Sequence, residues 1–281
     1  MIPSLPPSTG PIGVFDSGYG GLTILDKIRG LMPEYDYIYL GDSARCPYGP
    51  RSFEVVYEFT LQAVSKLFEL GCPLVILACN TASAKALRTI QQINLPVIDA
   101  TRRVLGVIRP TAECIGEITR SRHVGILATA GTIKSESYLL EIHKLSPDIV
   151  VTGEACPMWV SLVENNEYQS EGADYFVKQH INRLLDKDPM IDTIILGCTH
   201  YPLLLDKIRQ FTPGHIRIIA QGEYVARSLQ DYLNRHPEMD ARCEKGGKCR
   251  FLTTESESKF EESASIFLGR QDIKVESIAL E

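Results

Sequence analysis

The chain has 281 residues, of which 44% are hydrophobic and 23% are charged, so it has enough apolar side chains for a core of normal size. Its formal net charge of −6 and the lack of a basic stripe argue against nucleic acid as a main partner. No apolar run approaches the roughly 20 residues that a membrane span needs.

The first ten residues are rich in Pro and Ser and lack the charged and apolar regions of a signal peptide. We therefore expect a disordered leader at 1–10 and a cytoplasmic protein. The eight cysteines are then expected to be reduced thiols, because a long, well-cored chain without a secretion signal has little need of disulfides.

The first predicted strand covers 12–15 and runs into a glycine-rich turn at 16–21, followed by a helical pattern from Leu22. A strand, a glycine-rich turn and a helix in this order point backbone N–H groups at an anion. The glycine spacing alone is a weak signal, but Asp16 and Ser17 add an acid and a hydroxyl at the strand end.

The rest of the chain alternates between strands and helices. Further strands are predicted at 37–40, 75–78, 96–98, 123–127, 148–151, 194–197, 216–220 and 250–254. Helices are predicted at 52–70, 80–90, 102–119, 133–145, 159–164, 203–211, 223–233 and 258–268, with a further polar helix ending at 185.

Two distant stretches, 75–84 and 194–203, share one pattern: an apolar run, a small residue, a cysteine and then polar side chains. Such short apolar runs predict buried strands of a parallel sheet. Cys79 and Cys198 would then lie at the carboxyl ends of strands, where open α/β sheets bind their ligands. Two strand ends with matching residues predict a single site to which both parts of the chain contribute.

The two halves also match in length, because the turn at Asp16 lies 63 positions before Cys79 and the turn at Thr129 lies 69 positions before Cys198. This predicts an α/β fold of two pseudo-symmetric domains, each a mainly parallel sheet flanked by helices. The predicted division is a first, discontinuous domain at 11–100 plus 213–281 and a second domain at 101–212.

Two cysteines can form a redox pair, bind a metal or act in catalysis, and their spacing in the sequence helps to decide among these functions. The two cysteines are 119 positions apart, unlike a dithiol redox motif, and a zinc site would need more ligands. A Cys–His nucleophile would leave Cys79 without a role. Two thiols acting as acid and base on opposite faces of one carbon, as in a racemase, use both. Helix N-termini could lower both thiol pKa values, and nothing in the sequence suggests a pyridoxal lysine or a metal, so no cofactor is expected.

Four ordered motifs, at 15–22, 41–49, 78–83 and 197–204, closely resemble the signatures of cofactor-independent glutamate racemases. The resemblance spans about 11–270. It implies interconversion of L- and D-glutamate, which supplies D-glutamate for peptidoglycan, and an active site in the cleft between two α/β domains. It also implies a homodimer.

The resemblance assigns roles residue by residue. Cys79 and Cys198 correspond to the acid/base thiols, Asp16 lies beside the substrate ammonium, and Glu164 and His200 correspond to assisting groups. The substrate-binding positions, which also include Asp16 and His200, are Ser17, Asn80, Thr81, Thr132 and Thr199 for the α-carboxylate or ammonium, and Pro47, Tyr48 and Gly49 for the distal carboxylate.

Three alternatives stay open on the sequence alone. One is another two-cysteine enzyme, such as an aspartate or hydantoin racemase or a maleate-type isomerase, against which the loop at 47–49 argues. The second is a non-catalytic amino-acid-binding module, and the third is a thiol redox protein. The other cysteines are expected to be core, loop or surface thiols: Cys46, Cys72, Cys114, Cys156, Cys243 and Cys249.

Overall fold

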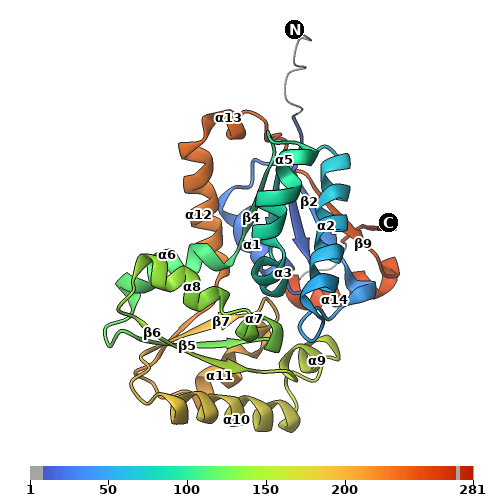
Figure 1. Cartoon of the computed structure of the whole chain (residues 1–281). Helices are drawn as coiled ribbons and strands as arrows, with labels where there is room; N and C mark the ends of the chain where they lie inside the picture. The colour runs from blue at the N-terminus through green and yellow to red at the C-terminus, as the bar shows by residue number, and fades with distance from the viewer. Residues whose placement is uncertain (1–8, 270–272, 281) are drawn as a thin grey trace.

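A computed structural model describes residues 9–269 and 273–280, and it contains two parallel sheets in two parts of the molecule (Figure 1). The predicted α/β class is confirmed. The expected leader at 1–10 lies outside the described residues except for its last two. Of these, Gly10 bridges to Cys243, so it belongs to the folded first domain.

The first sheet has six strands in the order β10-β9-β2-β1-β3-β4. Its strands are β1 (Ile12–Asp16), β2 (Tyr37–Gly41), β3 (Leu74–Leu77), β4 (Arg103–Gly106), β9 (Cys249–Thr253) and β10 (Val275–Ser277). The helices of this part are α1 (Leu22–Leu31), α2 (Phe53–Glu69), α3 (Asn80–Lys85), α4 (Leu87–Thr89), α5 (Leu95–Ile98), α12 (Gly222–Arg235), α13 (Pro237–Asp240) and α14 (Glu257–Leu268).

The second sheet has four strands in the order β6-β5-β7-β8. Its strands are β5 (His123–Ala128), β6 (Val150–Ala155), β7 (Thr193–Gly197) and β8 (Arg217–Ile219). Its helices are α6 (Ile108–Ile118), α7 (Ala130–Lys134), α8 (Ser137–Leu145), α9 (Trp159–Glu164), α10 (Glu171–Lys187) and α11 (Leu205–Phe211).

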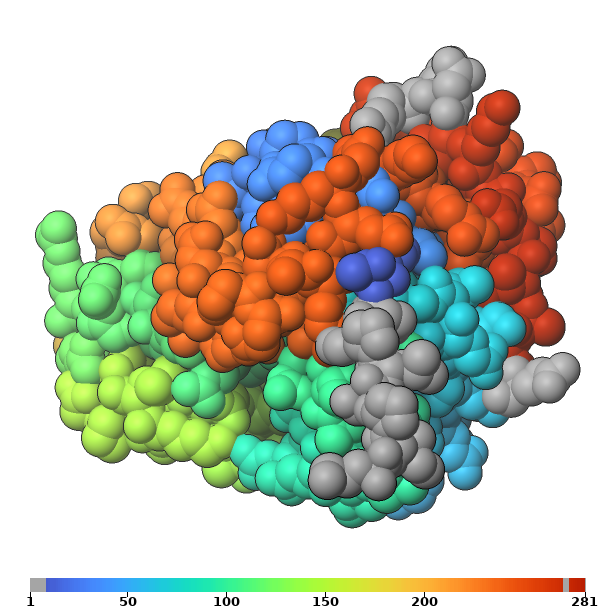
Figure 2. All heavy atoms as spheres, turned by 90° about the horizontal axis from the view of Figure 1, so that it is seen from above, coloured from blue at the N-terminus to red at the C-terminus, as the bar shows by residue number. Residues whose placement is uncertain are grey.

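Helices cover both faces of each sheet, which is why the central strands are apolar throughout. Along β1, Ile12 and Val14 pack under α1, α12 and α14, whereas Phe15 packs under α2. In the second sheet, α6 and α8 cover one face and α9, α10 and α11 cover the other. Figure 2 shows the C-terminal segment around α12 lying beside the N-terminal segment, so the first domain is discontinuous in sequence.

Three predictions of secondary structure are wrong. The segment at 96–98 forms part of helix α5, because Pro96 fits the first turn of a helix and Val97 is 85% exposed, away from any sheet. The helix predicted from 102 starts only at Ile108, because the four residues of β4 pair with β3. The helix predicted at 133–145 is interrupted at Glu136, whose φ of 55° is left-handed.

Sheet pairing also corrects the predicted division of the chain. The strand predicted at 216–220 forms as β8, but it pairs with β7 in the second sheet and not with the first domain. Conversely, β4 belongs to the first sheet. The chain therefore crosses between the two sheets near Val107 and Gln221, whereas the sequence placed the crossings at 100–101 and 212–213. In the described part of the chain, no helix has the length and apolar character to cross a membrane.

The end of β2 is packed too closely to accept a side chain. A Cβ added at Gly41 would lie 2.6 Å from the backbone oxygen of Gly18 and 2.8 Å from Phe260 Cε2. We expect Gly41→Ala to lower the free energy of unfolding by about 1–3 kcal/mol, measured by urea denaturation, because the glycine-rich turn must move.

A Cβ at Gly30 in α1 would meet nothing within 4 Å. Gly30→Ala is therefore the control and should raise the same free energy by about 0.5–1 kcal/mol. Equal stabilities of the two variants would contradict this packing argument.

Candidate active site

Cys79 lies two residues beyond the end of β3 and caps the N-terminus of α3. Its sulfur accepts a hydrogen bond from the backbone N–H of Ala82 at 3.4 Å, and its thiol donates to Ser17 Oγ at 3.4 Å. The residue is only 5% exposed. The predicted position at a strand end is confirmed, and its neighbour Ser17 directly follows the adjacent strand β1.

Asp16 ends β1 and is fully buried. Its Oδ2 accepts from the Gly18 N–H at 2.9 Å, and its Oδ1 accepts from the Thr199 hydroxyl of the second domain at 3.4 Å. Burial raises the pKa of Asp16, although the nearby His200 opposes the shift. This carboxylate is therefore a poorly compensated negative charge at the domain junction, suited to meet a cation.

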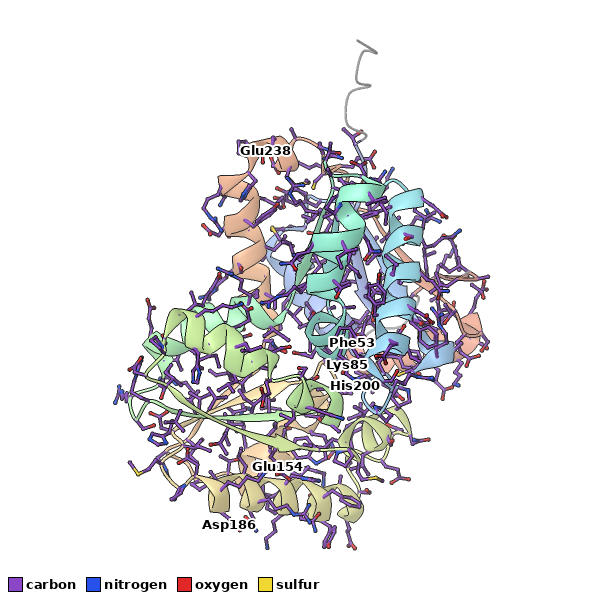
Figure 3. All side chains as sticks on the ribbon, viewed as in Figure 1. Phe53, Lys85, Glu154, Asp186, His200 and Glu238 are labelled. Atoms are coloured by element: carbon purple, nitrogen blue, oxygen red, sulfur yellow. The ribbon has the colours of Figure 1, made fainter. Side chains whose placement is uncertain are left out.

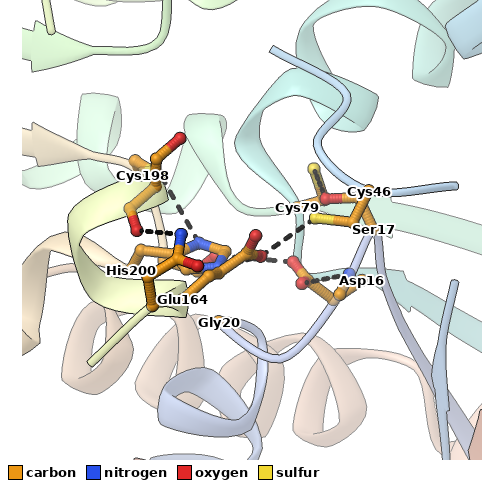
Figure 4. Close-up of polar contacts among 12 residues, drawn as sticks. Asp16, Ser17, Gly20, Cys46, Cys79, Glu164, Cys198 and His200 are labelled. Carbon is orange, nitrogen blue, oxygen red and sulfur yellow. Dashed lines mark hydrogen bonds and ion pairs between the residues drawn. The ribbon is translucent and has the colours of Figure 1, made fainter. Parts of the chain in front are cut away.

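Cys198 follows β7 and is 7% exposed. Figure 4 shows the groups beside it: His200 Nδ1 lies 3.8 Å from the Cys198 sulfur, and His200 Nε2 lies 3.0 Å from Glu164 Oε1 of α9. Glu154, another acidic residue of the second domain, instead contacts His180 at 2.7 Å. Figure 3 shows Glu154 within the second domain and His200 at the junction, so Glu164 is the carboxylate that reaches this site.

The contact between His200 and Glu164 is an ion pair. Burial on its own would lower the pKa of His200, but hydrogen bonds to Cys198 and Glu164 outweigh it and hold that pKa well above the ordinary value. Burial on its own would raise the pKa of Glu164, and His200 with the Cys46 thiol holds it below the ordinary value. The Cys198 thiol thus faces an imidazolium held by a carboxylate.

The Cys79 thiol has a different electrostatic environment. Burial, followed by the charge of Asp16, raises the pKa of Cys79 to about 12. The position at a helix N-terminus predicts the opposite shift. The hydrogen bond with Ser17 and the one from the Ala82 N–H do lower this pKa, but burial is the larger effect.

Cys46 is a site residue that the sequence analysis assigned to the loop fillers. Its thiol donates to Glu164 Oε1 at 3.0 Å, the same oxygen that contacts His200. A Cβ added at Gly18 would lie 2.9 Å from the Cys46 sulfur, so the thiol is packed against the glycine-rich turn. Its place in the motif at 41–49, beside Tyr48, was the available signal.

The loop that carries Tyr48 and Gly49 is anchored in the first domain and touches the second. Tyr48 is buried, and its hydroxyl donates to Asp42, which also accepts from Arg45 Nε at 2.7 Å. The Gly49 carbonyl accepts from the Gly131 N–H of the second domain at 3.1 Å. Pro47 precedes these residues in the same half-buried loop.

Three threonines from both domains meet beside this loop. Thr81 Oγ1 lies 3.0 Å from Thr129 Oγ1 and 3.4 Å from Thr132 Oγ1. Thr129 was recognised only as the start of a turn, and its contact with Gly49 could not be read from sequence. The side-chain amide of Asn80 points elsewhere, with partners in the protein at both ends, so its backbone N–H is the group left for a ligand.

Comparison with known proteins gives consistent matches. A family model described as Asp/Glu/hydantoin racemase matches residues 23–229. A glutamate racemase from Roseobacter denitrificans is 38% identical over 270 residues, covering 92% of this chain and 97% of that protein.

Two solved structures match nearly the whole chain. The glutamate racemase of Bacillus anthracis matches with a TM-score of 0.87 and 36% identity, over 96% of this chain and 98% of that one. The glutamate racemase of Francisella tularensis, solved in complex with D-glutamate, matches with a TM-score of 0.85 and 31% identity, over 99% of both chains.

The ion pair makes the His200 charge depend on Glu164. We expect Glu164→Gln to lower the His200 pKa toward the ordinary value of about 6.5, followed by NMR titration of labelled histidine. Because the raised pKa favours the protonated ring in the folded state, the pair stabilises the fold fully below the ordinary pKa. That stabilisation is lost as pH rises through the raised pKa.

Glu154→Gln is the matched control, because it removes another buried carboxylate that contacts an imidazole, that of His180. It should leave the His200 resonance unmoved. Identical His200 titrations in Glu164→Gln and the wild type would contradict the ion pair.

Proposed function

This chain belongs to the Asp/Glu/hydantoin racemase family, and we propose that it interconverts L-glutamate and D-glutamate by proton transfer at the α-carbon. The observation that carries the proposal is the pair of buried thiols at matching strand ends, one from each domain. The resemblance stated from the four sequence motifs is confirmed at the level of the family.

The proposed reaction uses both thiols at once. One thiolate removes the α-proton, so that a C–H bond breaks and an S–H bond forms. The other thiol delivers its own proton to the opposite face of the carbon and becomes a thiolate. Cys79 and Cys198 exchange roles when the reaction runs in reverse, so the chain needs no external oxidant or reductant.

The two bases are assisted in different ways. The His200 imidazolium stabilises the thiolate of Cys198, and Glu164 holds the ring in place. On the other side, a substrate ammonium beside Asp16 would offset the charge that raises the Cys79 pKa. Substrate binding would then bring the Cys79 thiol closer to ionisation, which couples recognition of an amino acid to activation of the base.

Substrate recognition is assigned mainly to neutral donors. The hydroxyls of Thr81, Thr132 and Thr199 line the junction where an α-carboxylate would lie, and Ser17 is beside Cys79. Backbone N–H groups near Gly49 would hold the distal carboxylate. Such donors bind a carboxylate in a dry site without a full counter-charge that must also be desolvated.

We also propose that the enzyme acts in the cytoplasm as a homodimer and supplies D-glutamate for peptidoglycan. The motif resemblance supports this setting, and so does the chemistry, because two catalytic thiols require a compartment that keeps them reduced. Cys79 and Cys198 are free thiols. Sedimentation equilibrium measures the assembly directly.

The main rival within the same chemistry is racemisation of aspartate. The loop carrying Tyr48 and Gly49 is expected to select the longer side chain, because it fixes where the distal carboxylate must reach. We expect kcat/KM for D-glutamate to exceed that for D-aspartate by at least about 10²-fold, a difference of about 2.7 kcal/mol, in a circular dichroism assay. Faster turnover of aspartate would refute the assignment.

Each cysteine should be necessary for racemisation. We expect Cys79→Ser and Cys198→Ser to lower kcat by at least about 10³-fold without unfolding, because a serine hydroxyl is a far weaker acid than a thiol. In D₂O, each variant should retain exchange of the α-proton of only one enantiomer. Cys114→Ser is the control, since this half-buried thiol of α6 donates only to the Thr111 carbonyl.

Full activity in either catalytic variant would rule out two-base chemistry. A non-catalytic binding module predicts no exchange even in the wild type. A thiol redox protein predicts disulfide reductase activity instead, so the same samples separate all three functions.

A further inference from the structure

The chain crosses between the domains twice, and one side chain ties the two crossings together. Val107 lies between β4 and α6, and Gln221 lies between β8 and α12. Gln221 Nε2 donates to the Val107 carbonyl at 3.1 Å, and the Val107 N–H donates to Ser83 Oγ, of helix α3, at 3.3 Å. Both crossings and α3 therefore form one hydrogen-bonded hinge.

Three buried side chains form a closed triangle of hydrogen bonds at this hinge. The Tyr138 hydroxyl donates to Asn80 Oδ1 at 2.7 Å, and Asn80 Nδ2 donates to Gln221 Oε1 at 2.8 Å. Gln221 Nε2 donates to the Tyr138 oxygen at 2.6 Å. Each member is both donor and acceptor, so flipping either amide would place donor against donor or acceptor against acceptor.

Two members of the triangle lie next to the strand ends that carry Cys79 and Cys198. Asn80 directly follows Cys79 and begins α3. Tyr138 belongs to α8, and its ring lies against Gly197, the residue before Cys198: a Cβ added at Gly197 would be 3.1 Å from Tyr138 Cε2. The triangle thus spans from one cysteine-bearing segment to the other, although neither thiol takes part in it.

We propose that Tyr138 and Gln221 are positioning residues that set the placement of Cys79 relative to Cys198. The inference rests on the proposed function, because a proton can be removed from one face and returned to the other only when both thiols are in place together. In a dry interior, a closed set of short hydrogen bonds is stiff and costly to break. Misplacing a reacting group by about 1 Å can cost up to 10²-fold in rate.

A substitution that spares packing tests this role. Tyr138→Phe keeps the ring on Gly197 and removes both hydrogen bonds of the hydroxyl. We expect kcat for glutamate to fall about tenfold in both directions while KM changes less than twofold, at a temperature where the variant is folded. Gln221→Met removes another corner of the triangle, together with the hydrogen bond to Val107, and should act in the same direction.

Isotope partitioning separates positioning from mere stabilisation. In D₂O, the ratio of deuterium in recovered substrate to deuterium in inverted product should rise in both variants. The reason is that a carbanion between misplaced thiols is reprotonated more often on the face that it left, by a thiol that has meanwhile exchanged its proton with D₂O. A purely structural role would lower Tm without moving this ratio.

Tyr37→Phe is the matched control. Tyr37 is equally buried, and its hydroxyl donates to the Met32 carbonyl at 2.8 Å; it begins β2, at the end of the strand opposite to the site. This variant should lower Tm while kcat and the deuterium ratio stay at wild-type values. Wild-type ratios in both Tyr138→Phe and Gln221→Met would overturn the proposal.

A second measurement does not depend on glutamate turnover. If the wild type racemises no glutamate, the proposed function fails, and alkylation of Cys79 and Cys198 followed by mass spectrometry then decides the hinge. The triangle predicts severalfold faster alkylation of both thiols in Tyr138→Phe than in Tyr37→Phe. Equal rates in these two variants would reject the triangle as the element that holds the two strand ends together.

Discussion

The parallel direction of the strands is the constraint on which the rest of this structure depends. Because both faces of each sheet are covered by helices, polar side chains are tolerated mainly where strands end. The central strands β1, β3, β5 and β7 all end toward the junction of the two sheets, so Asp16, Cys79, Thr129 and Cys198 converge there. These polar and reactive side chains therefore gather at one place, and each domain alone supplies only half of them.

The convergence of two halves also explains why the charges of the site are arranged as they are. Asp16 is buried in the first domain, and its closest partner across the junction is a neutral hydroxyl, that of Thr199. The second domain instead carries a complete ion pair, Glu164 with His200. One half is thus left with a negative charge that favours a cation, and the other half already holds an imidazolium beside its thiol. The backbone pattern is nearly symmetric, but the electrostatics are not.

Sequence alone was sufficient for features that depend on short-range patterns. The two cysteines, Asp16 and the strand–turn–helix units follow from apolar runs and turn residues, and the structure places them as expected. The residues of edge strand β4 were predicted as helix, and edge strand β8 was assigned to the wrong domain. The partners of both strands are fixed by tertiary pairing, which a local hydrophobic pattern does not reveal.

Long-range contacts could not be predicted from the sequence. Cys46 was taken as a filler, since its contact with Glu164 joins residues 118 positions apart. The substrate role of Asn80 stays a prediction, and tertiary structure commits its side-chain amide to Tyr138 and Gln221. In each case the side chain is identifiable in sequence, whereas its partner depends on how the two domains meet.

The burial of both thiols has a mechanical consequence. With Cys79 and Cys198 at 5% and 7% exposure, an amino acid can reach them only if the domains part. The hinge holds two covalent crossings and a buried triangle. The loop at 46–49 is joined to the second domain by single hydrogen bonds, including the one between Gly49 and Gly131 and the one between Cys46 and Glu164. An opening motion that pivots about the hinge would break these loop contacts.

Reclosure would then do two things in one motion. Under the proposed function, the loop at 46–49 would bring its backbone N–H groups to the distal carboxylate, and the same movement would return the Cys46 thiol to Glu164. Since that carboxylate oxygen also holds His200, the cation beside Cys198 is fully supported only when the loop is seated. A substrate that does not hold the loop in this position would leave Glu164 without the Cys46 hydrogen bond and His200 less well supported beside Cys198. Selection of the substrate side chain would therefore be linked to the ionisation of Cys198 through one atom, Glu164 Oε1.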